Sequence, residues 1–344
     1  MEVDHFLRSE LAGAAETARR LEEIGFDGIY TAEAAHEPFF PLVLAAEHTS
    51  RARLFTNIAV AFARSPMDLA MVSDDLQRLS GGRFVLGLGS QIRPHIEHRY
   101  SMDWSRPVAR MGEMVSAIKA VHRAWNGRVP LDYRGEIYRH TLMTPFFDPG
   151  PNPFGAPPVW VAALGPQMTA KAAEVGDGVL VHPFHTGKFV REHTAPAVAA
   201  GLARAGRRRD DFTVHATPIV CTGSTPEELE RAAVGVRGLL AFYGSTPSYR
   251  VTLDAHGWGE LQTELNAMTK QGQWDELASR VPDEVFEELA VHGTPDEIAG
   301  LVADRYGTAV DRVGLSMPYE TSRETVEALV AGFHSLALQT TPTT

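Results

Sequence analysis

The side chains that could do chemistry lie just after segments that we predict to be buried strands. They are histidines, amides, hydroxyls and glycines, with few carboxylates among them. In chain order they are Glu33, His36, Gly89, Ser90, Gln91, His95, His98, Gly165, His182 and His185. Histidine exchanges a proton near neutral pH, and glycine lets a neighbour approach the backbone closely. This combination suits proton transfer beside a bound planar or anionic group.

Two glycine-containing stretches favour such a group. In AALGPQMTAKAAEVGDG, Gly165-Pro166 stands where a predicted strand gives way to a helix. Exposed amides at a helix start, with the helix dipole behind them, bind anions. The segment 87–90 ends the strand RFVLGLG with small residues against which a flat ring could lie. The alternatives, a plain turn at Gly165 and a packing glycine at Gly87, stay open.

A metal hydrolase is disfavoured. The pairs His95/His98 and His182/His185 have ligand-like spacing, but two loop histidines are a weak metal signal. The first strand offers only His5 rather than two histidines, and there is no G-x-S-x-G nucleophile motif. We therefore expect no metal site. A catalytically idle barrel with a binding role also stays open, although the loops just described speak against it.

Composition narrows the class of protein further. The 344 residues include 32 basic and 43 acidic ones, for a net charge of −11, which disfavours nucleic acid and anionic membranes as partners. A single cysteine, Cys221, fits a reducing compartment and excludes an internal disulfide. No apolar run approaches the ~20 residues of a spanning helix, and the start lacks a signal-peptide pattern. We expect a cytoplasmic protein.

The elements that position these side chains alternate between strand and helix. The predicted strands are Val3–Leu7, 26–33, 53–62, 83–89, 159–164, 177–184, 212–221 and 311–318. The predicted helices are Glu10–Ile24, Leu42–Thr49, Pro66–Leu79, Arg106–Trp125, Pro166–Val175, one that ends near Arg204, Pro226–Phe242, one that starts at Pro295 after Thr294, and Arg323–Ala337. This order predicts a parallel (β/α)8 TIM barrel.

We expect 1–344 to be a single domain with two insertions, after strands four and seven. They span about 130–157, which is aromatic and rich in proline, and about 245–285, which is mostly helical. A doubly wound sheet would need a G-x-G-x-x-G fingerprint after the first strand, where the sequence is LRSELAGAAE.

Several of these stretches together resemble the bacterial luciferase-like flavin and deazaflavin oxidoreductases over nearly the whole chain. The stretches are FDGIYTAEAAHEPF, TNIAVAFARSPMDLAMVSDDLQRLSGGRFVLGLGS, RMGEMVSAIKAVHRAW, PPVWVAALGPQMTAKAAEVGDGVLVHPF and HGTPDEIAGLV. Two features, TNIAVAFARSPM and HTLMTPFFDPGP, are similar to the branch that uses coenzyme F-420, a deazaflavin hydride carrier. The resemblance implies a luciferase-like barrel that binds this cofactor.

The resemblance also implies roles for particular residues. His36 matches a histidine near the reactive ring, where it would act as acid or base or bind the substrate. Ala35 replaces the Asp that commonly precedes it, so the carboxylate partner is either lost or supplied by Glu33 or Glu37. His95 is a further catalytic candidate by position.

The cofactor contacts implied in the same way include a non-prolyl cis peptide at Asn57-Ile58. The full set is Asn57, Ile58, Gly89, Ser90, Gln91, Ala163, Leu164 and Gly165, with His182 added by its position. The reaction implied is hydride transfer between coenzyme F-420 and a small organic substrate. The alternative on the same fold is an FMN-dependent monooxygenase. By analogy with the family we expect a homo-oligomer, a dimer or larger.

Overall fold

The computed structural model describes residues 1–8, 10–127 and 129–340, and the chain divides into two compact units. The N-terminal unit comprises residues 5–180 and 197–213. The C-terminal unit comprises 1–4, 181–196 and the chain from 214 onward.

The N-terminal unit is built on parallel strands that pair in the order β2, β3, β5 and β8, with the short β4 also paired to β5. These strands are β2 (Gly28–Thr31), β3 (Arg53–Thr56), β4 (Ala59–Val60), β5 (Phe84–Gly89), β8 (Val159–Ala163) and most of β9 (Gly178–Val181). Nearly every residue in them is buried, as expected for strands covered on both faces.

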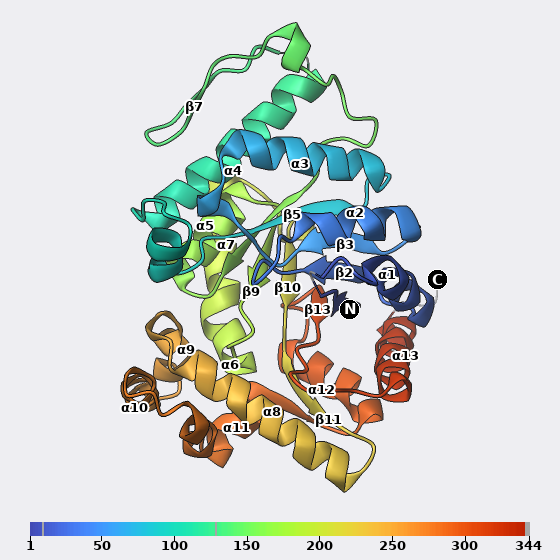
Figure 1. Cartoon of the computed structure of the whole chain (residues 1–344), viewed down its shortest axis with the longest axis vertical. Coiled ribbons are helices and arrows are strands. Elements are labelled where there is room, and N and C mark those ends of the chain that lie inside the picture. The colour runs from blue at the N-terminus through green and yellow to red at the C-terminus, as the bar shows by residue number, and fades with distance from the viewer. Residues whose placement is uncertain (9, 128, 341–344) are drawn as a thin grey trace. The chain divides into compact units, whose positions relative to one another are not determined.

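Helices that are neighbours in the sequence pack against one another around this sheet (Figure 1). They are α1 (Ala14–Ile24), α2 (Phe39–His48), α3 (Pro66–Leu79), α4 (Pro107–Gly127), α5 (Pro166–Val175) and most of α7 (Ala195–Ala205). The start of α3 is set by a capping box, in which Ser65 and Asp68 satisfy each other's backbone amides, and by Pro66 in the first turn. These local signals explain why the predicted bounds of α3 are confirmed.

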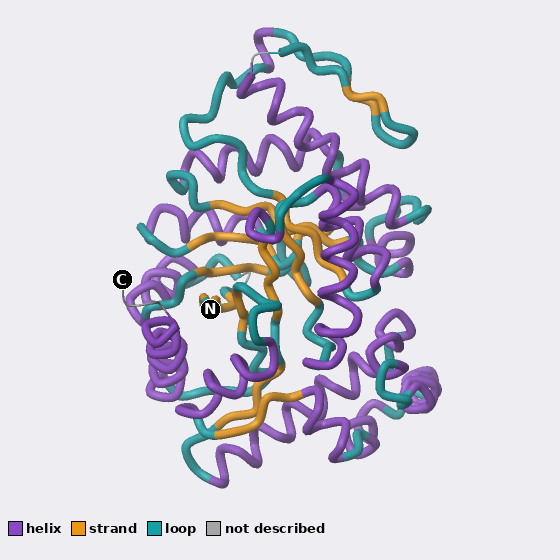
Figure 2. Tube along the Cα trace, turned by 180° about the vertical axis from the view of Figure 1, so that it is seen from behind, coloured by secondary structure: helices purple, strands orange, loops and turns teal. Residues whose placement is uncertain are grey.

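The predicted excursion after the fourth strand is confirmed as a small antiparallel hairpin of β6 (Tyr133–Arg134) and β7 (Arg139–His140). Figure 2 shows its two short strands at the end of long loops. Glu113 on α4 holds the turn, since its carboxylate accepts from the amides of Glu136, Ile137 and Tyr138.

The C-terminal unit contains a second set of parallel strands. Strand β13 (Arg312–Gly314) pairs with both β1 (Glu2–Phe6) and β10 (Thr213–Ala216), and β11 (Ile219–Thr222) pairs with β12 (Ala290–Gly293). Its helices are α6 (Gly187–Phe189), α8 (Pro226–Gly244), α9 (Arg250–Asp254), α10 (Gly259–Lys270), α11 (Asp283–Leu289), α12 (Pro295–Tyr306) and α13 (Arg323–Thr340).

The buried polar groups of the C-terminal unit include an ion pair and a thiol. The Asp4 carboxylate accepts from Arg312 at 3.0 and 2.5 Å, and both residues are almost fully buried. Burial lowers the pKa of Arg312 to about 10. Cys221 on β11 is completely buried in an apolar cluster, and burial raises the pKa of its thiol to about 11.

Eight parallel strands, β1, β2, β3, β5, β8, β9, β10 and β13, alternate with helices in the described part of the chain, so the predicted (β/α)8 barrel is confirmed. The two predicted insertions appear as the β6–β7 hairpin and as the helical segment between α8 and β12. Among the described residues, no helix combines the length and apolar character that crossing a membrane requires.

Two strand predictions are wrong in detail. The run 53–62 is not one strand, because it is interrupted between β3 and β4 at Asn57-Ile58. The run 212–221 is interrupted at Pro218, which has no amide to donate, so β10 and β11 join different sheets. Strand β12 was not expected, since 290–293 has no strand signal apart from its pairing with β11.

Two glycines of β5, Gly87 and Gly89, lie in close contact with the neighbouring segment that contains β3 and the cis peptide. A Cβ on Gly87 would lie 1.7 Å from the carbonyl oxygen of Thr56, so β3 itself fills that space. The Thr56 hydroxyl donates to the Gly87 carbonyl at 2.6 Å. A Cβ on Gly89 would lie 2.8 Å from the side chain of Ile58. Gly87 is therefore a packing glycine, and Gly89 lies against the Asn57-Ile58 peptide.

Replacing Gly87 tests this packing. Gly87→Ala is expected to destabilise the protein by about 3 kcal/mol, because backbone must move to admit the methyl group. Gly300→Ala on α12 is the matched control, since nothing lies within 4 Å of its Cβ position and alanine favours a helix by up to about 1 kcal/mol. Denaturant unfolding measures both, and equal stability of the two variants would contradict the account.

A second prediction concerns pH. Burial lowers the pKa of His182 and His215 from 6.5 to about 3, and that of His185 to about 4. The unfolded chain therefore binds more protons below about pH 6.5, and the free energy of unfolding falls as pH decreases, by about 1.4 kcal/mol per pH unit for each histidine. Urea unfolding near pH 7 and pH 5 measures this slope. His185→Gln should reduce this slope by the contribution of one histidine. His98→Gln, at an exposed position, should leave the slope unchanged.

Candidate active site

The loop after β2 is organised by the carboxylate of Glu33. Its side chain is only 6% exposed, and it accepts from the Val60 amide at 2.7 Å, from Arg64 at 2.6 Å and from the Tyr100 hydroxyl at 2.7 Å. Burial and the contact with Glu33 raise the pKa of Tyr100 to about 12, so the phenol stays protonated and acts as a donor. Glu33 is therefore tied to two separate segments of the N-terminal unit.

A second carboxylate of the same loop, Glu37, also contacts Arg64, at 3.3 Å. Its other oxygen accepts from the backbone amides of Phe39 and Phe40, at the start of α2. The Arg64 guanidinium therefore lies between the two acids that the sequence suggested as partners of His36. Sequence reasoning missed this arginine, although a nearly buried glutamate requires a cation or several donors nearby.

His36 itself is exposed in this loop, and its ring has no hydrogen-bond partner among the described residues. Arg99 donates to the carbonyl of Ala34, two residues before it. The loop backbone is thus held on both sides while the imidazole remains open to solvent. This arrangement leaves both ring nitrogens available to a ligand.

The peptide bond between Asn57 and Ile58 is cis, as predicted. Backbone hydrogen bonds enclose it, since the Asn57 amide donates to Thr31 at 2.6 Å and the Ile58 carbonyl accepts from Glu33 at 2.9 Å. Both residues are half-buried. Ile58 packs against Gly89, so the cis peptide lies beside the end of β5.

The chain turns away sharply after β5. Gln91 has a φ of 60°, and its side chain accepts from the Ile92 amide at 3.1 Å. The Ser90 hydroxyl donates to the Gln91 carbonyl at 3.1 Å. Ser90 and Gln91 are half-buried beside Gly89, whereas His95 lies further along, exposed, in the helical turn η2 (His95–Arg99). The structure thus brings Ser90 and Gln91 next to Gly89 but leaves His95 on the exposed outer side of that turn.

The end of β8 leads into α5 through Ala163, Leu164 and Gly165. The first two side chains are buried, and Gly165 caps α5 without any side-chain hydrogen bond. Nothing lies within 4 Å of a Cβ built on Gly165. Because Pro166 has no amide, the first free donors of the helix are those of the next residues. This helix start offers backbone donors beside open space, as an anion site requires.

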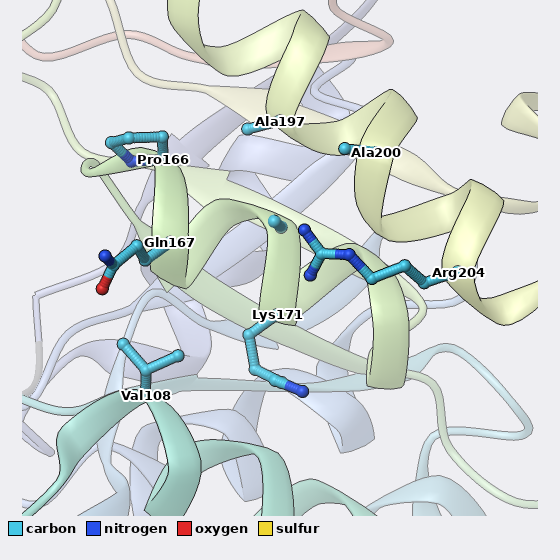
Figure 3. A pocket seen from close by; sticks show the side chains of 8 residues that line it. Val108, Pro166, Gln167, Lys171, Ala197, Ala200 and Arg204 are labelled. Atoms are coloured by element: carbon cyan, nitrogen blue, oxygen red, sulfur yellow. The ribbon is translucent and has the colours of Figure 1, made fainter.

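A pocket of about 430 Å³ lies along the flank of α5 (Figure 3). The residues that line it are Val108, Pro166, Gln167, Ala170, Lys171, Ala197, Ala200 and Arg204. None of them is a predicted site residue, and both cations contact Glu174, at 2.8 Å from Lys171 and 3.5 Å from Arg204. The pocket therefore adjoins the start of α5 at Pro166 and Gln167 but is lined by none of the predicted site residues.

His182 belongs to the C-terminal unit, at the carboxyl end of β9. Its Nδ1 accepts from the amide of Phe184 at 3.1 Å, so Nε2 carries the proton of the neutral ring. His185 donates to the carbonyl of His182 at 2.7 Å and accepts from the buried Tyr306 hydroxyl at 2.7 Å. No group of three or more metal-ligating side chains occurs in the described ranges.

Comparisons with known proteins agree with this geometry. An uncharacterized protein of Mycobacterium tuberculosis is 47% identical over 97% of this chain and 98% of its own. The 5,10-methylenetetrahydromethanopterin reductase of Archaeoglobus fulgidus is 30% identical over 86% of this chain and 87% of its own. Among solved structures, the coenzyme F420 dependent tetrahydromethanopterin reductase from Methanopyrus kandleri superposes with a TM-score of 0.80 and 20% identity, over 97% and 99% of the two chains.

The family model for luciferase-like monooxygenases matches residues 4–312. That span contains the loop of Glu33 and His36, the cis peptide and the glycine-ended strand β5. The chain therefore belongs to the luciferase-like monooxygenase family.

Proposed function

We propose that this protein is an oxidoreductase that binds coenzyme F-420 and acts on a small organic substrate by hydride transfer. The observation that carries the proposal is the start of α5, where backbone donors border open space at Gly165. The relatives support it, since the Archaeoglobus protein is a reductase and the Methanopyrus reductase depends on coenzyme F420.

The residues present fit a phosphate-bearing planar cofactor. The space beside Gly165 suits a phosphate, because an added Cβ there would meet no protein atom and helix amides favour an anion. The half-buried residues Asn57 and Ile58, beside the buried Gly89, carry no charge and suit a flat ring. Ser90 and Gln91 directly follow Gly89. When bound, the cofactor supplies hydride chemistry at its ring carbon C5, and the protein supplies orientation.

His36 is the residue proposed to handle the proton. It is exposed, and the nearby acids Glu33 and Glu37 are engaged with Arg64 rather than with its ring. A neutral imidazole can accept a proton from a substrate or donate a hydrogen bond to it. Glu33, Arg64 and Tyr100 then act as positioning residues that hold the loop beneath the imidazole.

Other parts of the proposal follow the family and the composition. We propose a small-molecule substrate, a cytoplasmic location and a homo-oligomer.

The test of the central proposal is cofactor binding. Coenzyme F-420 should bind the purified protein tightly, as measured by its fluorescence, and FMN should bind weakly or not at all. Tight FMN binding without detectable F-420 binding would favour a flavin monooxygenase instead.

Gly165→Val tests the phosphate site. The backbone at Gly165, with φ −69° and ψ 150°, accepts any L residue, and the new side chain would enter open space. We therefore expect unchanged thermal stability but F-420 binding weakened tenfold or more, about 1.4 kcal/mol. Unchanged affinity in the folded variant would remove this loop from the site.

His36→Ala tests the proton-transfer role. With a substrate found by screening the oxidation of reduced F-420, turnover should fall by roughly 10²–10⁴-fold, the usual effect of losing an acid–base group. Cofactor affinity should change little, because no proposed phosphate or ring contact is removed. His95→Ala, made in parallel, serves as the comparison. Full turnover of the His36→Ala variant would contradict this role. A loss of turnover in His95→Ala but not in His36→Ala would assign the role to His95.

A further inference from the structure

Three aromatic rings meet at the carboxyl end of β9 in the C-terminal unit. The ring of His182 lies against that of Tyr249, with centroids 4.0 Å apart and planes at 32°, and edge-on to Tyr243 at 4.9 Å. The two tyrosines contact each other at 5.9 Å. We call His182, Tyr243 and Tyr249 the aromatic cluster. In a barrel of this kind, ligands bind at the carboxyl ends of the strands.

Each ring of the aromatic cluster carries a donor without a partner in the part of the chain that the structure describes. All three residues are half-buried. The proton on His182 Nε2 and the hydroxyls of Tyr243 and Tyr249 have no partner among the described residues. Buried or half-buried donors normally find an acceptor. The cluster therefore presents three donors to whatever lies against it.

The two tyrosines of the aromatic cluster pack against the apolar core of this unit, which includes Phe184. Burial raises the pKa of Tyr249 to about 12 and also raises that of Tyr243, while it lowers that of His182 to about 3. No carboxylate, lysine or arginine contributes to these shifts. All three groups thus stay neutral near pH 7, and a charged ligand would find no partner there.

The insertion that follows α8 is fastened to this strand end. The Thr252 hydroxyl donates to the Phe184 carbonyl at 2.8 Å, and Lys188 donates to the Ala255 carbonyl at 2.9 Å. Thr186 and the ring of His256 form a further hydrogen bond at 2.8 Å. These bonds anchor α9 (Arg250–Asp254) and the turn after it, and α9 directly follows the short helix η6 (Pro247–Tyr249), which carries the Tyr249 ring that lies against His182. A feature positioned by so many contacts is preorganised for binding.

We propose that the aromatic cluster binds a flat, uncharged part of the substrate that carries a hydrogen-bond acceptor, such as a conjugated carbonyl or amide. The ring faces supply stacking, and the His182 and tyrosine edges supply donors. The assignment to substrate rests on the proposed function, whereas binding by the cluster does not. His182 then faces the substrate rather than the cofactor, to which its sequence position had assigned it.

The experiment uses two probes of the same shape, benzamide and benzoate, with the full-length protein labelled with ¹⁵N-histidine. Millimolar benzamide should shift the His182 Nε2 resonance, which His182→Phe identifies by its disappearance, and should leave that of His185 unchanged. Benzoate should shift neither. Saturation-transfer NMR should show benzamide affinity reduced about tenfold in His182→Phe and about threefold in Tyr249→Phe, since each loses one hydrogen bond.

Tyr306→Phe is the matched control, because its hydroxyl contacts His185 and lies outside the aromatic cluster. It should bind benzamide as the parent protein does. Equal binding of benzoate, or benzamide binding that is absent or unaffected by His182→Phe and Tyr249→Phe, would overturn the inference. Coenzyme F-420 fluorescence on the same samples separates the proposals. Benzamide binding without F-420 binding would refute the proposed function alone, and F-420 binding without benzamide binding would refute only this inference.

Discussion

The candidate site depends on one nearly buried carboxylate. Glu33 accepts from the Val60 amide of β4, from Arg64 and from Tyr100, so two segments far apart in the sequence, 60–64 and the end of η2, meet at this carboxylate. A buried carboxylate that loses its partner is costly, by about 3–5 kcal/mol. The loop after β2, the segment after β4 and the end of η2 are therefore fixed relative to one another. The exposed imidazole of His36 stands on this fixed loop.

The second constraint is the close approach of β3 to β5. Thr56 occupies the space that a side chain at position 87 would need, and Ile58 occupies that at position 89. The glycines at positions 87 and 89 of β5 are therefore required for packing against the segment that contains β3 and Ile58. As a consequence, the cis peptide packs directly against the end of β5, and this packing requires residues without side chains at positions 87 and 89.

Local signals explain which parts of this structure could be predicted from the sequence. Helices α3 and α5 begin at Pro66 and Pro166, where proline and the preceding cap residue mark a helix start, and their bounds were predicted correctly. The barrel followed from the alternation of apolar runs and amphipathic helices. The cis peptide was predicted only from the family resemblance, because neither Asn57 nor Ile58 is a proline and neither residue type indicates a cis bond.

What could not be predicted depends on contacts between distant segments. Nothing near Arg64 in the sequence indicates that it joins Glu33 and Glu37, 31 and 27 positions away. Strand β12 forms only because β11 lies beside it. The cluster of His182 with Tyr243 and Tyr249 likewise brings together a strand end and an insertion whose sequence carries no recognisable motif.

The burial of Cys221 has a practical consequence for spectroscopy. Its thiol is inaccessible, and with a pKa near 11 it is almost entirely protonated at neutral pH, so it reacts slowly with maleimides or nitroxide reagents. It is also the chain's only cysteine. A cysteine introduced at an exposed position, such as Ala34 in the β2 loop, would therefore carry a fluorophore or spin label at one known place. The native protein, treated with the same reagent, is the control for labelling at Cys221.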